Sequence, residues 1–253
     1  MKVVACYKIV PEEQDIVTNA DRSLSFDRAE WKIGQYDLPA IEAGVRIVEE
    51  AGGEMSILSI GGRQIDHSKL IKNALSRGPE KLYLVIDESL SQADAYQTAA
   101  TLAAALRKTG FDLVLCGEGS SDIYAQQVGA QLGELLQVNV FNAVSRIIPK
   151  GDAVLIERTL EKEVEVLEVS LPAVLSVTTD ITLPRICQMK EILAAGKKPV
   201  TKWTLAELGV QAEKGMETVS TLAPENADRK QIIVEGDSDD KIGLFWQNIR
   251  KEL

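Results

Sequence analysis

The feature that most constrains the fold is an alternation of short apolar runs with amphipathic stretches along the first half of the chain. Apolar runs at 3–10, 55–61, 81–87 and 111–117 have the length and composition of strands buried on both faces. Amphipathic stretches with glycine-bearing turns separate them. This alternation predicts an α/β fold, a doubly wound, mostly parallel sheet of the Rossmann-like, adenine-nucleotide-binding kind with helices on both faces.

Helices are expected at 38–53, 67–78 and 94–110, with a fourth beginning near Ile123. Right-handed crossovers bring the turns after the apolar runs to one edge of the sheet. In such sheets, ligands bind outside the carboxyl ends of the strands. The tips that follow Val10, Ile60, Ile86 and Cys116 are therefore expected to face one crevice.

The pattern changes near residue 150. Polar and apolar residues alternate through 153–179, as in antiparallel strands that expose one face to solvent. The stretch SLPAVLSVT at its end is apolar and is expected to return to the main sheet. Residues 181–200 combine a proline-flanked loop, a short helix and the Lys197–Lys198 pair, which we interpret as solvated. Residues 201–210 predict a short helix, capped by Thr204 and ended by Gly209. The remainder has too few apolar residues for a core of its own and ends in an amphipathic helix, so we expect an arm.

Charge and cysteine content narrow the function. The formal net charge of -10 argues against a nucleic-acid partner, because phosphate binding requires clustered Lys and Arg. The three cysteines are far apart and match no metal-ligand spacing; we expect Cys6 and Cys116 to be buried in strands of a cytoplasmic protein. The single histidine, His67, is expected in a solvated first helical turn, which argues against His-based acid–base chemistry.

The best candidate for chemistry is LVLCGEGSSDIYAQQVG, residues 113–129, where a strand turns into the predicted fourth helix. Gly117 and Gly119 permit a close approach of the backbone. Ser120, Ser121 and Asp122 are good helix caps, and the free N–H groups of a helix start hold anions such as phosphate.

The same stretch offers further polar groups. Glu118 and Asp122 are placed to accept hydrogen bonds from ribose hydroxyls, and Gln126 and Gln127 to bond a base or flavin ring. A plain, well-capped turn explains the stretch equally well. It is not the glycine pattern of a dinucleotide site, and it has no Walker lysine.

A second candidate, GQYDLPA at 34–40, lies opposite in the predicted crevice. Tyr36 is placed to stack on a ring, although Asp37 is equally explained as a helix cap. No arrangement of nucleophile and base is visible, so the chain is interpreted as a binding protein.

Several stretches together resemble one family: CYKIVP, GQYDLPAIEAGVRI, LCGEGSSDIYAQQVG and SLPAVLSVTTDITLPRICQMKEILAAGKKPV. They resemble the electron transfer flavoprotein beta subunit, in particular its Fix-type, carnitine-linked bacterial branch, over nearly the whole chain. The resemblance implies an electron carrier and not an enzyme, in a heterodimer with an alpha subunit that provides most contacts to FAD. It also implies an acyl-CoA-type dehydrogenase as partner, with a membrane quinone reductase reached only indirectly.

In this family the beta subunit holds AMP, or a second FAD in electron-bifurcating members. The resemblance assigns that pocket to Cys6, Gly34, Gln35, Tyr36, Asp37, Ile60, Gly117, Glu118, Gly119, Ser120, Ser121, Asp122, Gln126, Gln127, Val128 and Gly129. It also implies three parts: a nucleotide-binding domain over 1–184, a partner-recognition loop over 185–200 and a C-terminal arm over 201–253. Met189 occupies the position of the apolar anchor that docks on a dehydrogenase.

The chain departs from the bifurcating pattern in one place. Those members carry Asp-Gly-Asp-Thr before Gln-Val-Gly, whereas this chain has Asp122, Ile123, Tyr124 and Ala125. The identity of the nucleotide therefore stays open. A stand-alone nucleotide-binding regulator of the universal-stress type is the alternative, and residues 181–253 distinguish the two because such a regulator needs neither loop nor arm.

Overall fold

The computed structural model describes residues 1–211, 214–225 and 230–252. They form two compact units. One consists of Met1–Val17 and Ser25–Ser220, and the other of Thr18–Leu24 and Thr221–Leu253. The larger unit holds the sheet and every candidate site residue.

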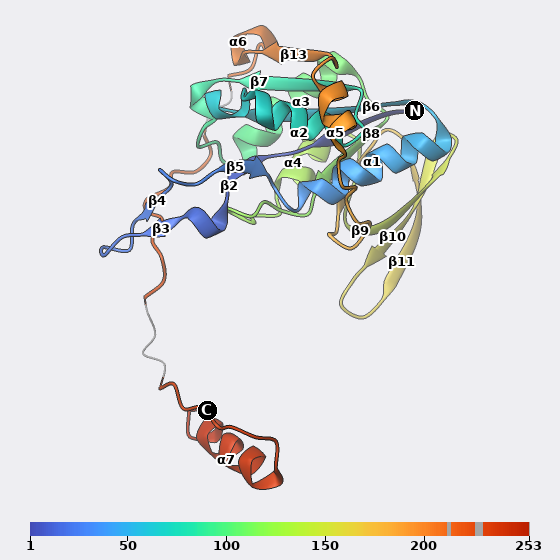
Figure 1. The fold of residues 1–253 in the computed structure, drawn as a ribbon. Coiled ribbons are helices and arrows are strands. Elements are labelled where there is room, and N and C mark those ends of the chain that lie inside the picture. Colours follow the sequence, from blue (N-terminus) through green and yellow to red (C-terminus); the bar gives the residue numbers. More distant parts are fainter. Residues whose placement is uncertain (212–213, 226–229, 253) are drawn as a thin grey trace. The chain divides into compact units, whose positions relative to one another are not determined.

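The centre of the larger unit is a nine-stranded sheet (Figure 1). In spatial order its strands are β11 (Val164–Ser170), β10 (Ala153–Thr159), β9 (Asn139–Lys150), β12 (Ala173–Val177), β8 (Leu113–Gly117), β1 (Lys2–Cys6), β6 (Glu54–Gly61), β7 (Lys81–Ile86) and β13 (Val200–Trp203). β10 runs antiparallel to both of its neighbours, and the other adjacent strands run parallel. The predicted mostly parallel α/β sheet with an antiparallel extension is confirmed.

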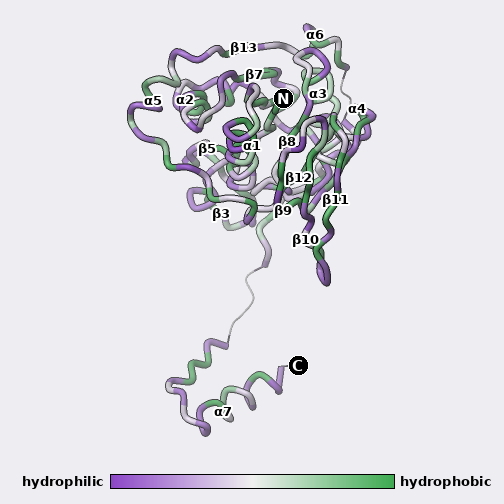
Figure 2. Tube along the Cα trace, turned by 90° about the vertical axis from the view of Figure 1, so that its right-hand side faces the viewer, coloured by the Kyte–Doolittle hydropathy of each residue, from purple (hydrophilic) through white to green (hydrophobic). Residues whose placement is uncertain are grey.

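Helices cover both faces of the parallel strands (Figure 2). α1 (Asp37–Ala51) and α2 (Ser68–Ser76) pack on one face, and α3 (Ala95–Thr109) and α4 (Val128–Leu136) on the other. Side chains of a strand alternate between the two cores: Val3 and Ala5 of β1 face α1, whereas Val4 and Cys6 face α3. Burial on both faces explains why these strands appear as continuous apolar runs in the sequence.

Shorter elements complete the larger unit. They are β2 (Ile9–Pro11), η1 (Glu13–Asp15), β5 (Trp31–Ile33), η2 (Arg63–Ile65), η3 (Glu88–Leu90), α5 (Met189–Ala195) and α6 (Leu205–Leu208). The two-residue strands β3 (Val17–Thr18) and β4 (Leu24–Ser25) each have one residue in either unit. β2 pairs with β5 in an antiparallel ribbon. The apolar run 3–10 is therefore two strands, and the sheet strand ends at Cys6 instead of Val10.

Two helix predictions require correction. The fourth helix begins at Val128, not near Ile123, because Tyr124 and Gln126 adopt positive φ angles of 50° and 56° that an α-helix cannot contain. Residues 201–210 are not one helix, because Val200–Trp203 pairs with β7 as an edge strand. The predicted Thr204 cap and the Gly209 end of α6 are confirmed.

The smaller unit contains α7 (Asp239–Arg250), which confirms the predicted closing helix. Its apolar side chains Ile242, Phe245 and Trp246 are exposed. Within the described residues, no helix has the length and hydropathy needed to cross a membrane.

Candidate functional site

The candidate site lies where the order of the strands reverses. From β1 the chain proceeds to β6 and β7 on one side, and then returns to β8 on the other side of β1. Sheets of this kind bind ligands outside the carboxyl ends of the strands at such a point. We call the region outside the ends of β1 and β8 the β1–β8 crevice. Cys6 ends β1 and Gly117 ends β8, so two of the predicted residues lie at this switch point.

The start of α1 closes one wall of the crevice. The Gly34 N–H donates to the Lys8 carbonyl oxygen at 2.9 Å, and the Lys8 N–H donates to Asp37 Oδ2 at 2.8 Å. A Cβ on Gly117 would lie 2.6 Å from the Tyr36 carbonyl oxygen. Only glycine permits that approach, so the structure joins Gly34, Tyr36, Asp37 and Gly117 into one tight cluster.

Asp37 is a buried carboxyl group in this cluster. It is the first residue of α1 and not its cap, since Tyr36 holds the cap position and makes no side-chain cap bond. Burial raises the pKa of Asp37 to about 7, against the opposing effect of hydrogen bonds from the backbone N–H groups of Lys8 and Gly117. The side chain therefore titrates near neutral pH.

The cysteine at the crevice is a buried thiol. Cys6 and Cys116 are buried, as predicted. A side-chain hydrogen bond with Cys116, together with burial, raises the pKa of Cys6, so its thiol stays protonated.

A loop from Glu118 to Gln127 forms the opposite wall. Asp122 Oδ2 accepts a hydrogen bond from Lys8 Nζ at 2.6 Å, which connects this loop to the segment after β1. Desolvation acts to raise the pKa of Asp122, but the ion pair with Lys8 and a hydrogen bond with the Ser120 side chain together lower that pKa. Lys8 was missed by sequence reasoning, although its position two residues after β1 places it at the switch point.

Two tyrosines meet at the crevice. The rings of Tyr36 and Tyr124 are 5.0 Å apart between centroids and tilted by 48°. A Cβ on Gly119 would lie 2.5 Å from the Tyr124 ring, so this glycine accommodates a side chain of its own loop.

Glu118 lies between this loop and the end of β12. It is hydrogen-bonded to the Tyr124 side chain and to the Thr179 backbone. Desolvation and the charge of Asp180 raise the pKa of Glu118. Thr179 and Asp180 were also missed, although they directly follow the strand next to β8.

The start of α4 completes the loop. Gln127 is the cap residue and makes no side-chain cap bond within the described chain, so the expected caps Ser120, Ser121 and Asp122 are wrong. The first N–H groups of α4 therefore receive no side-chain oxygen at the cap, an arrangement that suits an anion. A Cβ on Gly129 would lie 2.1 Å from Ser176 Oγ, which shows that this helix start presses on β12.

Two predicted residues lie away from the β1–β8 crevice. Ile60 pairs with Val85 of β7, one strand further along the sheet. Met189 begins α5, which packs on α2 and not on the crevice.

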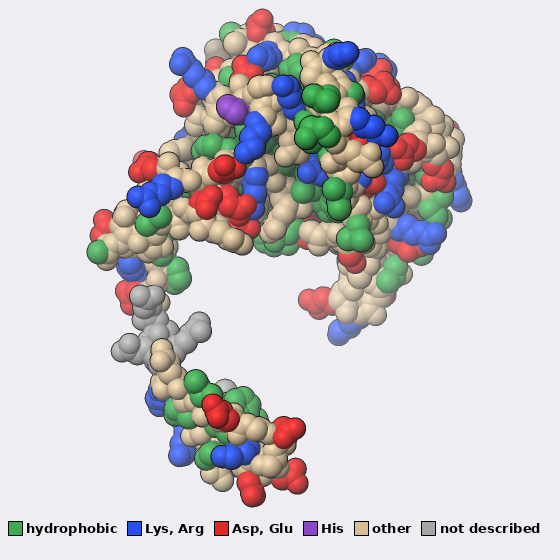
Figure 3. Space-filling view, in the orientation of Figure 1, with side chains coloured by type: hydrophobic (Ala, Val, Ile, Leu, Met, Phe, Trp, Pro, Cys, Tyr) green, Lys and Arg blue, Asp and Glu red, His purple; other side chains and the backbone are tan. Residues whose placement is uncertain are grey.

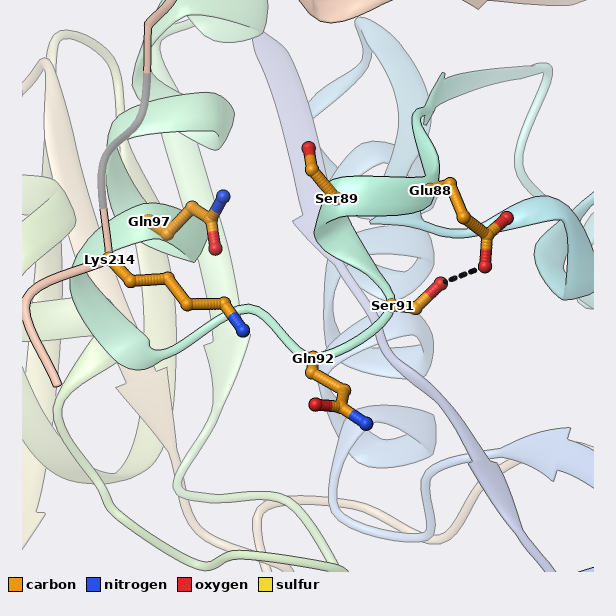
Figure 4. A pocket seen from close by; sticks show the side chains of 6 residues that line it. All are labelled: Glu88, Ser89, Ser91, Gln92, Gln97 and Lys214. Atoms are coloured by element: carbon orange, nitrogen blue, oxygen red, sulfur yellow. Dashed lines mark hydrogen bonds between the residues drawn. The ribbon is translucent and has the colours of Figure 1, made fainter. Parts of the chain in front are cut away.

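An open cavity of about 510 Å³ lies elsewhere, beside η3 and the start of α3 (Figure 4). It is lined by Glu88, Ser89, Ser91, Gln92, Gln97 and Lys214. None of the sequence-predicted site residues belongs to it.

The crevice offers backbone N–H groups, acids and two aromatic rings, a set that suits a phosphate, a sugar and a planar ring. Among the described residues, no group of three or more His, Cys, Asp or Glu side chains is arranged to hold a metal ion. In a comparison with protein families, the family described as electron transfer flavoprotein domain matches residues 23–208. That match spans the crevice loop, β12, α5 and β13.

Proposed function

The chain belongs to the electron transfer flavoprotein family, and from that premise we propose that it is the beta subunit of a heterodimeric electron carrier. The β1–β8 crevice is the observation that carries this assignment. We place the carrier in the Fix-type branch, transferring electrons between an acyl-CoA-type dehydrogenase and an acceptor in carnitine or acyl-CoA metabolism. The family consists of flavin-associated electron carriers, and flavin supplies the redox chemistry when bound.

The proposed nucleotide is AMP or a second FAD. The uncapped start of α4 would hold its phosphate, and Glu118 and Asp122 would accept from its sugar hydroxyls. The Tyr36–Tyr124 pair would face the planar ring. The glycines at Gly117 and Gly119 support this role less directly than expected, because each one admits a protein group at close range.

The partner subunit is supported by α7. Its Ile242, Phe245 and Trp246 are 55–56% exposed, and a water-exposed apolar helix face gains stability when a partner covers it. We propose that the alpha subunit covers this face and provides most of the contacts to the shared FAD. Met189, 71% exposed, is the proposed anchor on the dehydrogenase.

The decisive experiment is co-expression with an alpha subunit, followed by purification and extraction of bound cofactors. A yellow heterodimer with one FAD and one AMP identifies a simple carrier, whereas two FAD identify a bifurcating one. A stable, colourless chain that binds no alpha subunit would refute the proposal.

A further inference from the structure

Polar contacts attach the chain to the larger unit after β12. Lys198 Nζ donates to the carbonyl oxygens of Leu75 at 2.8 Å and Pro79 at 2.7 Å, which corrects its interpretation as a solvated lysine. Further along the chain, the carbonyl oxygen of Glu207 in α6 accepts a hydrogen bond from Lys108 Nζ at 3.4 Å. Lys108 belongs to the last turn of α3. The chain makes its next contact at the opposite end of the same helix.

Asp94 makes that contact at the start of α3. We call the described residues from 214 onward the tail. Asp94 is the cap residue of α3, and its Oδ1 accepts a hydrogen bond from the Gln97 N–H at 2.7 Å. Its Oδ2 accepts from two successive N–H groups of the tail, from Gly215 at 2.6 Å and from Met216 at 2.8 Å. One carboxylate therefore divides its two oxygens between the helix and the tail.

Hydrogen bonds, and not burial, attach the tail at this point. Met216 is 62% exposed and Val219 is 95% exposed. Among the residues that the structure describes, Met216 is also the last one whose backbone is hydrogen-bonded to the larger unit. In the smaller unit, hydrophobic side chains are exposed on the surface of α7 (Figure 3). The two bonds to Asp94 therefore fix the point from which the chain continues to α7, and we call this point the root of the tail.

The carboxyl group of Asp94 is charged at neutral pH. Desolvation acts to raise its pKa, but four backbone N–H groups lower it below its ordinary value. These groups belong to Gln97, Met216, Gly215 and Tyr96. Hydrogen bonds to an ionised acceptor are stronger than neutral ones, and successive backbone N–H groups that converge on one oxygen suit an anion. The charge therefore strengthens the attachment of the tail.

We infer that Asp94 is a positioning residue for assembly, because it fixes the root of the tail at the start of α3 and thereby the point from which α7 reaches the alpha subunit. A partner-binding segment with a fixed root samples fewer conformations before it binds, so it loses less entropy on association. The inference rests on the proposed function, in which the alpha subunit covers the apolar face of α7. It adds a residue of the larger unit to that assembly.

The substitution Asp94→Asn separates the two roles of this carboxylate. Asn caps helices as well as Asp does, but its amide has only one oxygen, so it accepts from Gln97 or from the tail and not from both. Asp87→Asn is the matched control. Asp87 caps η3 through one oxygen, Oδ1, which accepts from the N–H and the hydroxyl of Ser89 at 3.1 and 2.8 Å. An amide oxygen retains both of these bonds.

The root is tested on the full chain with trypsin, which cuts after lysine. Lys214 lines the open cavity beside η3 (Figure 4), and the N–H of the next residue, Gly215, is the one bonded to Asp94. Cleavage after Lys214 should be about tenfold faster in Asp94→Asn than in the wild type, because a protease cuts a segment that is free to leave the surface. Cleavage after Lys230 should keep its rate, and every rate should be unchanged in Asp87→Asn. Wild-type cleavage in both Asp94→Asn and Asp94→Ser would overturn the root.

Assembly is tested with an alpha subunit that the wild type binds. Asp94→Asn should raise the dissociation constant of the heterodimer about tenfold and leave the FAD content of the assembled heterodimer unchanged. Asp87→Asn should match the wild type in both quantities. If trypsin shows that the tail is released in Asp94→Asn, and its dissociation constant still equals that of Asp87→Asn, the positioning role is wrong.

Failure here is distinguishable from failure of the proposed function. If the wild type forms no flavin-loaded heterodimer with an alpha subunit, the electron carrier is refuted and the positioning role with it, whatever the trypsin assay shows. If the wild type assembles and the Asp94 variants assemble equally well, only the positioning role is refuted.

Discussion

Replacement of Asp37 by Asn should remove a pH dependence from the stability of the larger unit. Asp37 has a pKa of about 7 in the folded chain, against an ordinary value of 3.8. Between these values the folded chain binds more protons than the unfolded chain, so the free energy of unfolding falls as pH rises. The stabilisation by protonated Asp37 is complete below pH 4 and absent above pH 7.

The size of the effect follows from the shift. Each pKa unit corresponds to about 1.4 kcal/mol, and Asp37 is half-titrated at pH 7, so the wild type should lose about 2 kcal/mol relative to Asp37→Asn between pH 5 and pH 7. Asn does not titrate, so the difference in the free energy of unfolding between the two proteins cancels the groups that titrate in both. Urea unfolding of both proteins at a series of pH values measures this difference.

Glu30→Gln is the control for this measurement. The pKa of Glu30 is lowered by its hydrogen bond with Lys69, so its contribution is lost only in acid and is constant between pH 5 and pH 8. A flat difference for Asp37→Asn over the same interval would show that Asp37 is charged throughout, and the burial argument would then be wrong.

Four further measurements follow from the structure. Gly117→Ala should destabilise the larger unit by about 1–3 kcal/mol in urea unfolding, because its Cβ meets the Tyr36 carbonyl oxygen, while Gly243→Ala, with no atom near its Cβ position, should not. Asp122→Ala should lower the nucleotide content of the purified heterodimer, and full occupancy would contradict its role. Met189→Ala should slow electron exchange with the dehydrogenase about tenfold while cofactor content stays constant, as for loss of a central apolar anchor. Lys198→Met should cost about 1–3 kcal/mol, because it leaves carbonyl groups at the end of α2 without their donor; an unchanged urea midpoint would refute that.

The sheet was predictable because its strands are buried on both faces and therefore apolar throughout. The hydrophobic pattern did not predict β13, because this edge strand has only four residues and its Thr201 and Lys202 are polar. The start of α4 was misplaced because Ser120 and Asp122 are good caps on local grounds, whereas the loop conformation depends on Lys8, which is 114 residues away in the sequence from Asp122. Such long-range pairs leave no periodic signal.

The candidate site likewise contains residues that the sequence predicts and contacts that it does not. Sequence reasoning found Gly117, since the end of its strand follows from the hydrophobic pattern. Cys6 was assigned by the family resemblance alone, because the apolar run continues to Val10. Sequence reasoning did not find the Tyr36–Tyr124 contact or the contact of Glu118 with Thr179, because each depends on two segments that are distant in the sequence.

The route of the chain after β12 links two regions that have been treated separately. Thr179 contacts Glu118 of the crevice loop, and Arg185, six positions later, is bonded to α1, whose first residue Asp37 belongs to the crevice. Ligand and dehydrogenase would therefore act on the same short stretch and the same helix. Thermodynamic linkage then requires reciprocity: whatever factor an occupied crevice imposes on dehydrogenase affinity, the bound dehydrogenase imposes on the affinity of the crevice.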